Sequence, residues 1–530
     1  MDSELRRRIV YFLLSSIMLY VLFVYNSRES ILSNPVQSAI VSISFFSVVG
    51  IIIIAIYPEI LSPQRKMERI DDFVVIIATL TFLFIGLSLI NSFGTDNMEY
   101  TYEALNNFFQ GKNPYEMIYA PYTVQPTYTL SGGVASNFIY PPFSFIVYIP
   151  LYLLIKAFNL PGYVLNAENV IFAVILGLLL YKIGKEKDDD PFALFPVIFL
   201  YIITAVSIPP FYGVPIVIAS TFLALSYVNK NYLGGIGLAL AISFSQLSWL
   251  AFPFLLIYRI KSDNVGRQFL RSSYFLSFLI TLSIVNIPFL AWNPVRFIGN
   301  IITLNTQLIP VGQVGLTVIS YSGLYPMEPW FFTIVFGVVA MFLTYLYYQL
   351  FDYLKETIWL FPLIISWFLW RTLTEYFFMW IPLIFTSLFR TQYKLPAIKF
   401  DFKKKIVLPL LIIFVFLASL SVYAHESYVA SNPLKIDEVY TLQNTPPYTA
   451  LIIKVQNTKN EPVNITLVRV SIPNNLNMVW NSTETVIPPN SSALVFAYAS
   501  NSLEAINSTP FTVQVYSEYY FATYSVNSTQ

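Results

Sequence analysis

The sequence predicts a polytopic α-helical membrane protein of about thirteen transmembrane helices with a C-terminal β-sandwich domain. Of its 530 residues, 56% are hydrophobic and only 11% are charged, whereas soluble domains carry about 25% charged residues. Apolar runs of membrane length recur until about residue 424, where the composition changes to Asn, Ser, Thr, Val and Tyr. These features exclude an ordinary soluble enzyme and a disordered chain.

Residues 1–71 contain two apolar segments that precede the main helical module. Arg6, Arg7 and Arg8 come before the first segment, and basic residues mark the cytoplasmic side of membrane proteins. No cleavage site of small residues follows that segment, so we expect an anchor and not a removed signal peptide. The N-terminus is therefore predicted to be cytoplasmic, and a third span at about 72–92 places the polar residues 93–138 outside.

The module of residues 72–424 has one segment, 141–159, that breaks the alternation of charge. If it crossed the membrane, the lysines that follow the next span would lie outside, against the charge rule. We therefore expect a proline-broken helix that lies at the outer face, within an outer loop of residues 93–164. A second outer loop is expected at 292–328. Further spans are predicted at about 165–183, 192–209, 213–229, 233–260 (a pair broken near Gln246), 272–291, 330–351, 357–371, 375–392 and 406–424.

Residues 425–530 have the pattern of short strands. The runs 451–456, 464–472 and 511–516 are rich in β-branched residues, and Asn and Pro turns separate them. About seven such strands in roughly a hundred residues predict a β-sandwich. A basic loop before the last span places this domain outside the cell. Five Asn-x-Ser/Thr sequons agree with that side and are candidate N-glycosylation sites. They are Asn464, Asn481, Asn490, Asn507 and Asn527.

Several kinds of chemistry are excluded by composition. The chain has no cysteine, which excludes disulfides, thiol catalysis and zinc–thiolate sites. Its single histidine, His425, cannot form a His-rich metal site, and we expect it to begin the linker to the β domain. No metal and no cofactor are predicted. The net charge of +1 gives no indication of a nucleic-acid partner.

The first outer loop carries the most informative residues. We expect a short amphipathic helix with Asp96 as its N-cap, ended by Gly111. Asp96, Glu99 and Glu103 then fall near one face of the helix, and we expect this face to be turned toward the basic Lys112. Such a carboxylate near lipid could act as the general base that takes a proton from a sugar hydroxyl. The alternative is an N-cap with a solvated helix face.

The motifs of this loop resemble those of a known superfamily. They are Thr95-Asp96 followed by Tyr and Ala at helical spacing, then residues 111–115 (Gly-Lys-Asn-Pro-Tyr) and 140–142 (Tyr-Pro-Pro). With them the chain resembles the GT-C superfamily of membrane glycosyltransferases, and within it the polyprenyl-phosphate-mannose-dependent mannosyltransferases. The resemblance covers about residues 72–392. The two N-terminal spans and the β domain fall outside it.

The resemblance implies an activity and a GT-C-like fold for the helical module. The activity is inverting transfer of a hexose, with mannose as a candidate, from a polyprenyl- or dolichyl-phosphate donor. The acceptor on the outer face would be a glycan, a glycolipid or a protein. Asp96 would be the catalytic base and Glu99 a second catalytic carboxylate. The Trp-Trp-Asp motif of oligosaccharyltransferases is absent, which disfavours transfer of a whole glycan to protein.

The donor phosphate requires a cation near the outer interface. Relatives often carry Lys where this chain has Gln246, so the role passes to Arg371, Lys112 or Arg296. Arg371 is favoured because it lies in a short turn between two predicted spans. A structural ion pair with Glu375, at i+4, is the alternative. Further candidate substrate contacts are Asn113, Tyr115, Tyr140 and Gln246 itself.

Two other classes of function stay open. One is a transporter or flippase for a lipid-linked sugar, although the clear spans carry almost no charge in their middle. The other is a surface anchoring or interaction protein with an inactive GT-C-like bundle, although so many spans exceed what anchoring needs. In each case we expect a multi-pass protein in contact with membrane lipid. The lack of cysteine together with outer sequons suits an archaeal plasma membrane at least as well as an endomembrane.

Overall fold

The structure is a computed structural model that describes residues 3–28, 35–56, 67–124, 126–185, 191–206, 216–262, 266–303, 308–309, 314–389, 406–443, 445–472, 475–483, 485–499 and 505–527. Two parts of the sequence predictions lie outside these residues. They are the junction between the spans predicted at 192–209 and 213–229, which falls in 207–215, and the basic loop before the last span, which falls in 390–405.

Seven helices in the described part of the chain are long and apolar enough to cross a membrane, which supports the prediction of a membrane protein. They are α1 (Ser3–Arg28), α2 (Pro35–Ile56), α3 (Met67–Ser88), α7 (Ala167–Lys185), α12 (Ser273–Trp292), α15 (Pro329–Gln349) and α20 (Leu408–Ser431). Three shorter apolar helices are α8 (Phe195–Val206), α9 (Ile216–Val228) and α10 (Tyr232–Phe244). The count of thirteen spans is therefore not confirmed.

Several predicted spans consist of short helices. The described part of the predicted spans 357–371 and 375–392, which ends at residue 389, forms α17 (Leu360–Ser366), α18 (Thr374–Phe378) and α19 (Ile381–Leu388). A helix of eight residues is about 12 Å long, much less than the hydrocarbon core of about 30 Å. The break predicted near Gln246 is confirmed, because α10 ends at Phe244 and a 3-10 turn leads into α11 (Phe252–Ser262).

The segment of residues 141–159 is a broken helix, as predicted. It forms α5 (Phe143–Ile146) and α6 (Ile149–Ala157), separated by a turn at Val147 and Tyr148. Neither helix is long enough to cross a membrane. Its place at the outer face stays a prediction.

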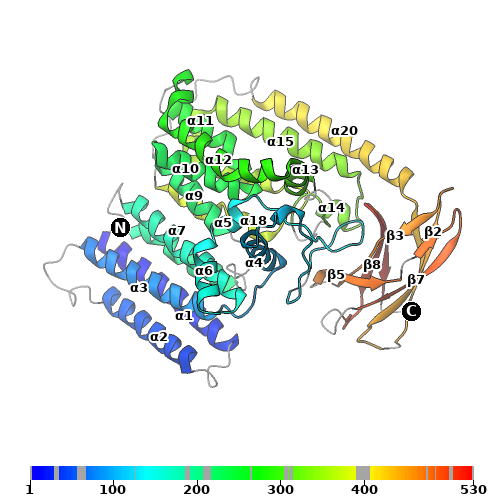
Figure 1. Ribbon diagram of the computed structural model, residues 1–530, viewed down its shortest axis with the longest axis horizontal. Coiled ribbons are helices and arrows are strands. Elements are labelled where there is room, and N and C mark those ends of the chain that lie inside the picture. The colour runs from blue at the N-terminus through cyan, green and yellow to red at the C-terminus, as the bar shows by residue number, and fades with distance from the viewer. Residues whose placement is uncertain are drawn as a thin grey trace.

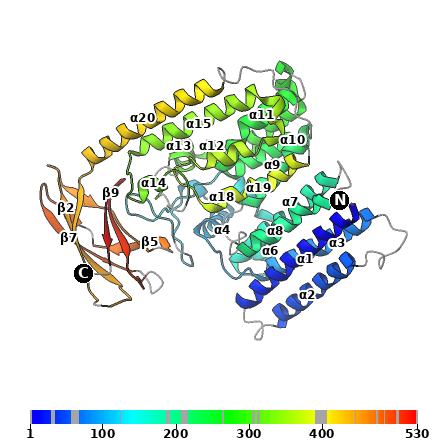
Figure 2. The ribbon, with the colours of Figure 1, turned by 180° about the vertical axis from the view of Figure 1, so that it is seen from behind.

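The helices form a layered body with the β domain at one end (Figures 1 and 2). Helices α1, α2 and α3 form a layer at the edge of the helical body, and this layer packs on α7 and α8. Helices α9, α10 and α12 form the next layer. Helix α15 lies beside α20, which runs to the β domain on the side of the molecule opposite the N-terminal helices (Figure 1).

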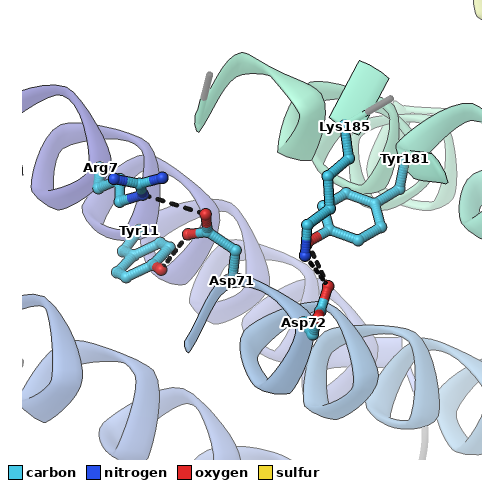
Figure 3. A network of polar contacts seen from close by, with 6 residues as sticks. All are labelled: Arg7, Tyr11, Asp71, Asp72, Tyr181 and Lys185. Carbon is cyan, nitrogen blue, oxygen red and sulfur yellow. Dashed lines mark hydrogen bonds and ion pairs between the residues drawn. The ribbon is translucent and has the colours of Figure 1, made fainter. Parts of the chain in front are cut away.

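Two adjacent aspartates of α3 tie the N-terminal helices to the rest of the module (Figure 3). Asp71 accepts hydrogen bonds from Arg7 and Tyr11 of α1, with 3.0 Å between Arg7 Nε and Asp71 Oδ2. Asp72 points to α7, where Lys185 Nζ lies 2.6 Å from its Oδ1. Because adjacent helical residues differ in direction by about 100°, one pair of aspartates can hold two neighbouring helices.

Helix α20 continues past the predicted end of the last span. The prediction that His425 begins a linker is wrong, since His425 lies inside α20. Its ring stacks on Tyr325 at 3.9 Å between centroids, and its Nδ1 lies 2.7 Å from the Pro326 carbonyl oxygen. Extra helical turns therefore anchor α20 on the loop before α15, and β1 follows almost at once.

The predicted C-terminal β domain is confirmed as antiparallel, with nine strands in its described part. Seven form one sheet in the order β1-β2-β7-β5-β4-β8-β9, and β3 pairs with β6. Strand β5 pairs with β4 along most of its length and with β7 at its end, so the sheet folds over and β1 contacts β9. One apolar core that includes Trp480 lies between the two halves. The strands are β1 (Leu434–Thr441), β2 (Ala450–Asn457), β3 (Val463–Ile465), β4 (Leu467–Ile472), β5 (Asn475–Ser482), β6 (Thr485–Ile487), β7 (Ser492–Tyr498), β8 (Phe511–Ser517) and β9 (Tyr520–Val526).

The β domain packs directly on the outer loops of the helical module. Apolar side chains from both parts form one cluster that includes Leu130, Tyr321, Tyr428 and Phe521. Inside it, Gln514 Nε2 donates to the Tyr321 carbonyl oxygen at 2.8 Å. The domain is therefore a packed part of the molecule and not a tethered appendage.

Candidate functional site

Helix α4 (Asp96–Phe109) confirms the predicted amphipathic helix of the first outer loop. It ends where predicted, because Gly111 has a φ of 74° and the N–H groups of Gly111 and Lys112 donate to carbonyls of the last turn. The prediction for its start is wrong in one detail. Thr95 is the N-cap and makes no side-chain capping bond, while Asp96 is the first helical residue.

Asp96 has one bonded and one available carboxylate oxygen. Its Oδ2 accepts a hydrogen bond from the backbone N–H of Thr127 at 2.8 Å. Its Oδ1 has no hydrogen-bond partner within the part of the chain that the structure describes, and the side chain is partly exposed. Asp96 therefore lies at the N-terminus of α4 with one carboxylate oxygen held by the backbone and the other available to a ligand.

The other two carboxylates of this helix face differ from Asp96. Glu99 is buried, and its oxygens accept from the N–H groups of Tyr122 and Thr123 and from the Thr123 hydroxyl, so its role here is to hold the loop. Glu103 is half-buried; burial first, and then the charge of Glu99, raise the pKa of its carboxyl to about 6. Asp96 and Glu103 are both partly exposed, but Asp96 is the one that a backbone hydrogen bond holds by one oxygen while the other has no partner among the described residues.

Arg371 approaches the same threonine from the far end of the module. Its Nη2 donates a long hydrogen bond of 3.5 Å to Thr127 Oγ1, and its Nε is buried without a partner. The predicted ion pair with Glu375 does not form, because α18 begins at Thr374 and Arg371 precedes it. Glu375 Oε2 is likewise buried without a partner.

Tyr140 completes the group around Thr127. Burial raises the pKa of its hydroxyl well above the usual value; the charge of Asp96 and the neighbouring Tyr376 add to that rise, and Arg371 opposes it. The charges of Asp96 and Arg371 therefore both act on this hydroxyl, which stays protonated. We call Asp96, Thr127, Tyr140, Arg371 and Tyr376 the Asp96 cluster.

Two predicted substrate contacts instead support the segment that carries Tyr140. Tyr115 is buried, and its hydroxyl donates to the Tyr140 carbonyl oxygen at 2.7 Å. Gln246 Nε2 donates to the carbonyl oxygens of Ile139 at 2.6 Å and Ile301 at 3.3 Å. Both side chains fix the backbone on which Tyr140 is mounted, and the amide of Gln246 does so without a charge.

The remaining predicted residues lie at the other end of α4. Lys112 and Arg296 are exposed, and Asn113 is buried with its Oδ1 accepting from the Tyr115 N–H at 3.1 Å. A helix of fourteen residues is about 20 Å long. Lys112 therefore does not face Asp96, contrary to the sequence prediction.

The loop of residues 127–135 joins the Asp96 cluster to the β domain. Thr466 Oγ1 of the β domain donates to the Leu130 carbonyl oxygen at 2.9 Å. Gly132 has a φ of 90°, and a Cβ there would lie 1.9 Å from the Thr466 carbonyl oxygen, so only glycine fits. The loop is thus held at Thr127 by the helical module and at Leu130 and Gly132 by the β domain.

Sequence reasoning missed two members of the cluster. Thr127 lies in a polar loop with no motif, and only the tertiary fold brings it between residues that are far apart in the chain. Tyr376 directly follows Glu375, close to Arg371 in the sequence. This proximity to Arg371 is the sequence feature from which Tyr376 could have been predicted. Within the described residues, no group of three or more His, Asp and Glu side chains is arranged to hold a metal ion.

Comparisons with protein-family models, with curated proteins and with solved structures find no match to this chain.

Proposed function

We propose that this protein is a membrane glycosyltransferase that uses a polyprenyl- or dolichyl-phosphate sugar, with Asp96 as the general base. The observation that carries the proposal is the convergence on Thr127 of an anionic carboxylate with an open oxygen and a guanidinium with no carboxylate partner. Lipid-phosphate sugar transfer needs both groups: a base for the acceptor and a cation for the leaving phosphate.

The reaction assigns one role to each charged group. Asp96 Oδ1 accepts the proton of the acceptor hydroxyl, and the oxygen attacks the anomeric carbon of the donor. The bond from that carbon to the phosphate oxygen breaks, and polyprenyl phosphate leaves with the electron pair. Arg371 stabilises the charge that grows on the phosphate. A single displacement inverts the anomeric configuration and needs no covalent intermediate.

The rest of the cluster orients these two groups. The Thr127 N–H fixes Asp96 Oδ2 and leaves Oδ1 free, so the base is presented in one direction. The Tyr140 hydroxyl remains a donor and can bind a sugar or phosphate oxygen beside Arg371. Arg371 is preferred to Lys112 and Arg296, which lie at the far end of α4 from the base.

The membrane arrangement belongs to the same proposal. With a cytoplasmic N-terminus, α3 leads outward and α4 begins at the outer surface, where the lipid phosphate of a donor would lie. The β domain would then be extracellular, above the Asp96 cluster, in a multi-pass plasma-membrane protein. A glycan, glycolipid or protein acceptor could reach the site from that side without crossing the bilayer.

The test is transfer by the purified full chain from a panel of dolichyl-phosphate sugars that includes mannose. We expect turnover by wild type, a loss of about 10²-fold or more in Asp96→Asn, and little change in Glu116→Gln, an exposed carboxylate at the other end of α4. Full activity in Asp96→Asn would remove Asp96 from the mechanism. A donor that binds without transfer would favour a lipid-linked-sugar transporter, and no donor binding would favour a surface-interaction protein.

A further inference from the structure

Strands β2 and β7 lie in the half of the β domain that is away from the helices (Figure 1). The half with β4, β8 and β9 packs on the outer loops. On the other half, Tyr440 of β1 and Phe496 and Tyr498 of β7 are 51%, 36% and 44% exposed. We call these three side chains the aromatic face. Exposed apolar patches on a folded domain generally mark a surface that something covers.

The strand register makes this face continuous. Tyr440 lies opposite Ile452, and Ile452 lies opposite Phe496, so the three form one row across β1, β2 and β7. Tyr498 is two residues further along β7 and therefore points to the same side. Its ring centroid is 5.8 Å from that of Phe496. The row is a flat platform with two adjacent rings at one edge.

A predicted glycosylation sequon borders that edge. Asn481 of β5 is exposed and lies opposite Tyr498 in the register. Paired residues point to the same face, with Cβ atoms about 4.5–5.5 Å apart. Thr483, the third residue of the sequon, donates its N–H to the Phe496 carbonyl oxygen at 3.0 Å and accepts the Phe496 N–H on its hydroxyl at 3.3 Å. The sequon therefore runs directly alongside the two rings.

We propose that an N-linked glycan on Asn481 covers the aromatic face. Its first sugar rings would lie on Tyr498 and Phe496, because the apolar C–H side of a pyranose packs on an aromatic ring while its hydroxyls stay in water. The Tyr440 hydroxyl, already bonded to Glu438, lies at the far end of the platform. This inference requires the β domain to lie on the outer side of the membrane, and it does not depend on the glycosyltransferase activity.

The other sequons provide a matched control. Asn490 is exposed in a turn with a φ of 50°, and its Nδ2 donates to Asn460 Oδ1 at 2.7 Å. Asn464 lies opposite Val486, which is not aromatic. A glycan on Asn490 would project from a turn and leave the aromatic face uncovered. Asn481 and Asn490 thus separate a glycan that packs on protein from one that only adds bulk.

The experiment measures glycan occupancy and tyrosine reactivity in the full chain, made in a host that modifies Asn-x-Ser/Thr sequons. Mass spectrometry should find Asn481 modified. Nitration of Tyr498 by tetranitromethane should be several-fold faster in Asn481→Gln than in wild type, and unchanged in Asn490→Gln. Nitration of Tyr163, which is half-buried in the helical module, reports general loosening and should be equal in all three proteins.

Three results would overturn the inference. The first is an unmodified Asn481 in a protein whose other sequons carry glycan. The second is equal nitration of Tyr498 with and without the Asn481 glycan. The third is equally fast nitration in Asn490→Gln, which would mean that any lost glycan exposes the domain. Transfer activity in the same samples is a separate readout, so failure of this inference and failure of the proposed function are distinguishable.

Discussion

The charged side chains at the start of α3 form ion pairs, whereas those around Thr127 do not pair with each other. Asp71 is paired with Arg7, and Asp72 with Lys185, so every cation in that network faces a carboxylate (Figure 3). In the Asp96 cluster, the described part of the chain offers no carboxylate to Arg371 and no hydrogen-bond partner to the second oxygen of Asp96. The α3 network thus satisfies its charges internally, whereas the cluster does not do so among the described residues.

This difference separates a structural role from a chemical one. A buried ion pair recovers its desolvation cost from its partner, and removing one member is strongly destabilising. A buried guanidinium without a carboxylate partner is costly and is a functional candidate. Substitutions in the first network should therefore change stability, and substitutions in the second should change activity.

Asp71→Asn should have the largest effect on stability. It leaves the Arg7 guanidinium, with a side chain only 6% exposed, without its carboxylate, at a cost of about 3–5 kcal/mol. The matched control is Asp72→Asn, whose pair has side chains 27% and 47% exposed and should cost less than about 1 kcal/mol. Denaturant unfolding in detergent measures both. Equal losses in the two variants would contradict the assignment of Arg7 and Asp71 as the buried anchor.

Arg371→Gln should weaken donor binding without unfolding the protein. A hydrogen bond to a charged group contributes about 1.5–3 kcal/mol, which corresponds to roughly a 10- to 150-fold higher Kd or KM for the lipid-phosphate donor. Arg371→Lys should recover part of the loss, since it keeps the charge and loses the planar fork. Arg296→Gln is the control and should change KM less than about twofold. A larger effect at Arg296 would move the phosphate site to α13 (Pro294–Ile298).

Gly132→Ala should reduce activity through the β domain. The new Cβ would meet the Thr466 carbonyl oxygen and would hold alanine at a positive φ, which costs about 1–3 kcal/mol. We expect the 127–135 loop to leave Thr466, with a fall of several-fold in kcat and faster proteolysis of that loop. Gly133→Ala has only a contact of 3.9 Å to accommodate and should behave as wild type. Unchanged kcat in a Gly132→Ala protein whose loop is cleaved faster would show that the β domain does not support the site.

Glu103→Gln should have the smallest effect, and its sign depends on pH. The pKa of this carboxyl is raised to about 6 in the folded protein, so the folded protein keeps the proton to a higher pH than the unfolded chain does. The protein therefore loses stability as the pH rises through about 6. Removing the ionised group should raise the apparent Tm by about 1–2 °C at pH 7.5 and leave it unchanged at pH 4. Thermal unfolding at the two pH values measures this. A lower Tm at pH 7.5 would contradict a destabilising effect of burying the ionised Glu103 beside Glu99.

The sequence predicts local features of the fold better than it predicts the site. The end of α4 at Gly111 and the break before Gln246 follow from residues that are neighbours in the chain. The short helices at 357–392 do not, because an apolar run has the same composition whether it crosses a bilayer or folds into several turns.

The site depends on long-range contacts that no local pattern encodes. Thr127 has no motif, yet the cluster is organised around it. Gln246 occupies a position where relatives often carry a lysine, and its amide nitrogen donates to two backbone carbonyls. The role of Asp96 as a base stays a prediction, whereas its predicted role as the N-cap is wrong because Thr95 holds that position.

The most direct test of the contrast between paired and open charges is to measure donor binding and single-turnover transfer separately in Asp96→Asn. We predict a Kd for dolichyl-phosphate mannose, or for the sugar that the panel identifies, within about twofold of wild type. The rate of the transfer step should fall by about 10²-fold or more, because the base is lost and the phosphate contact remains. A variant that transfers at the wild-type rate, or one whose loss lies entirely in donor binding, would contradict the role of Asp96 as the open base.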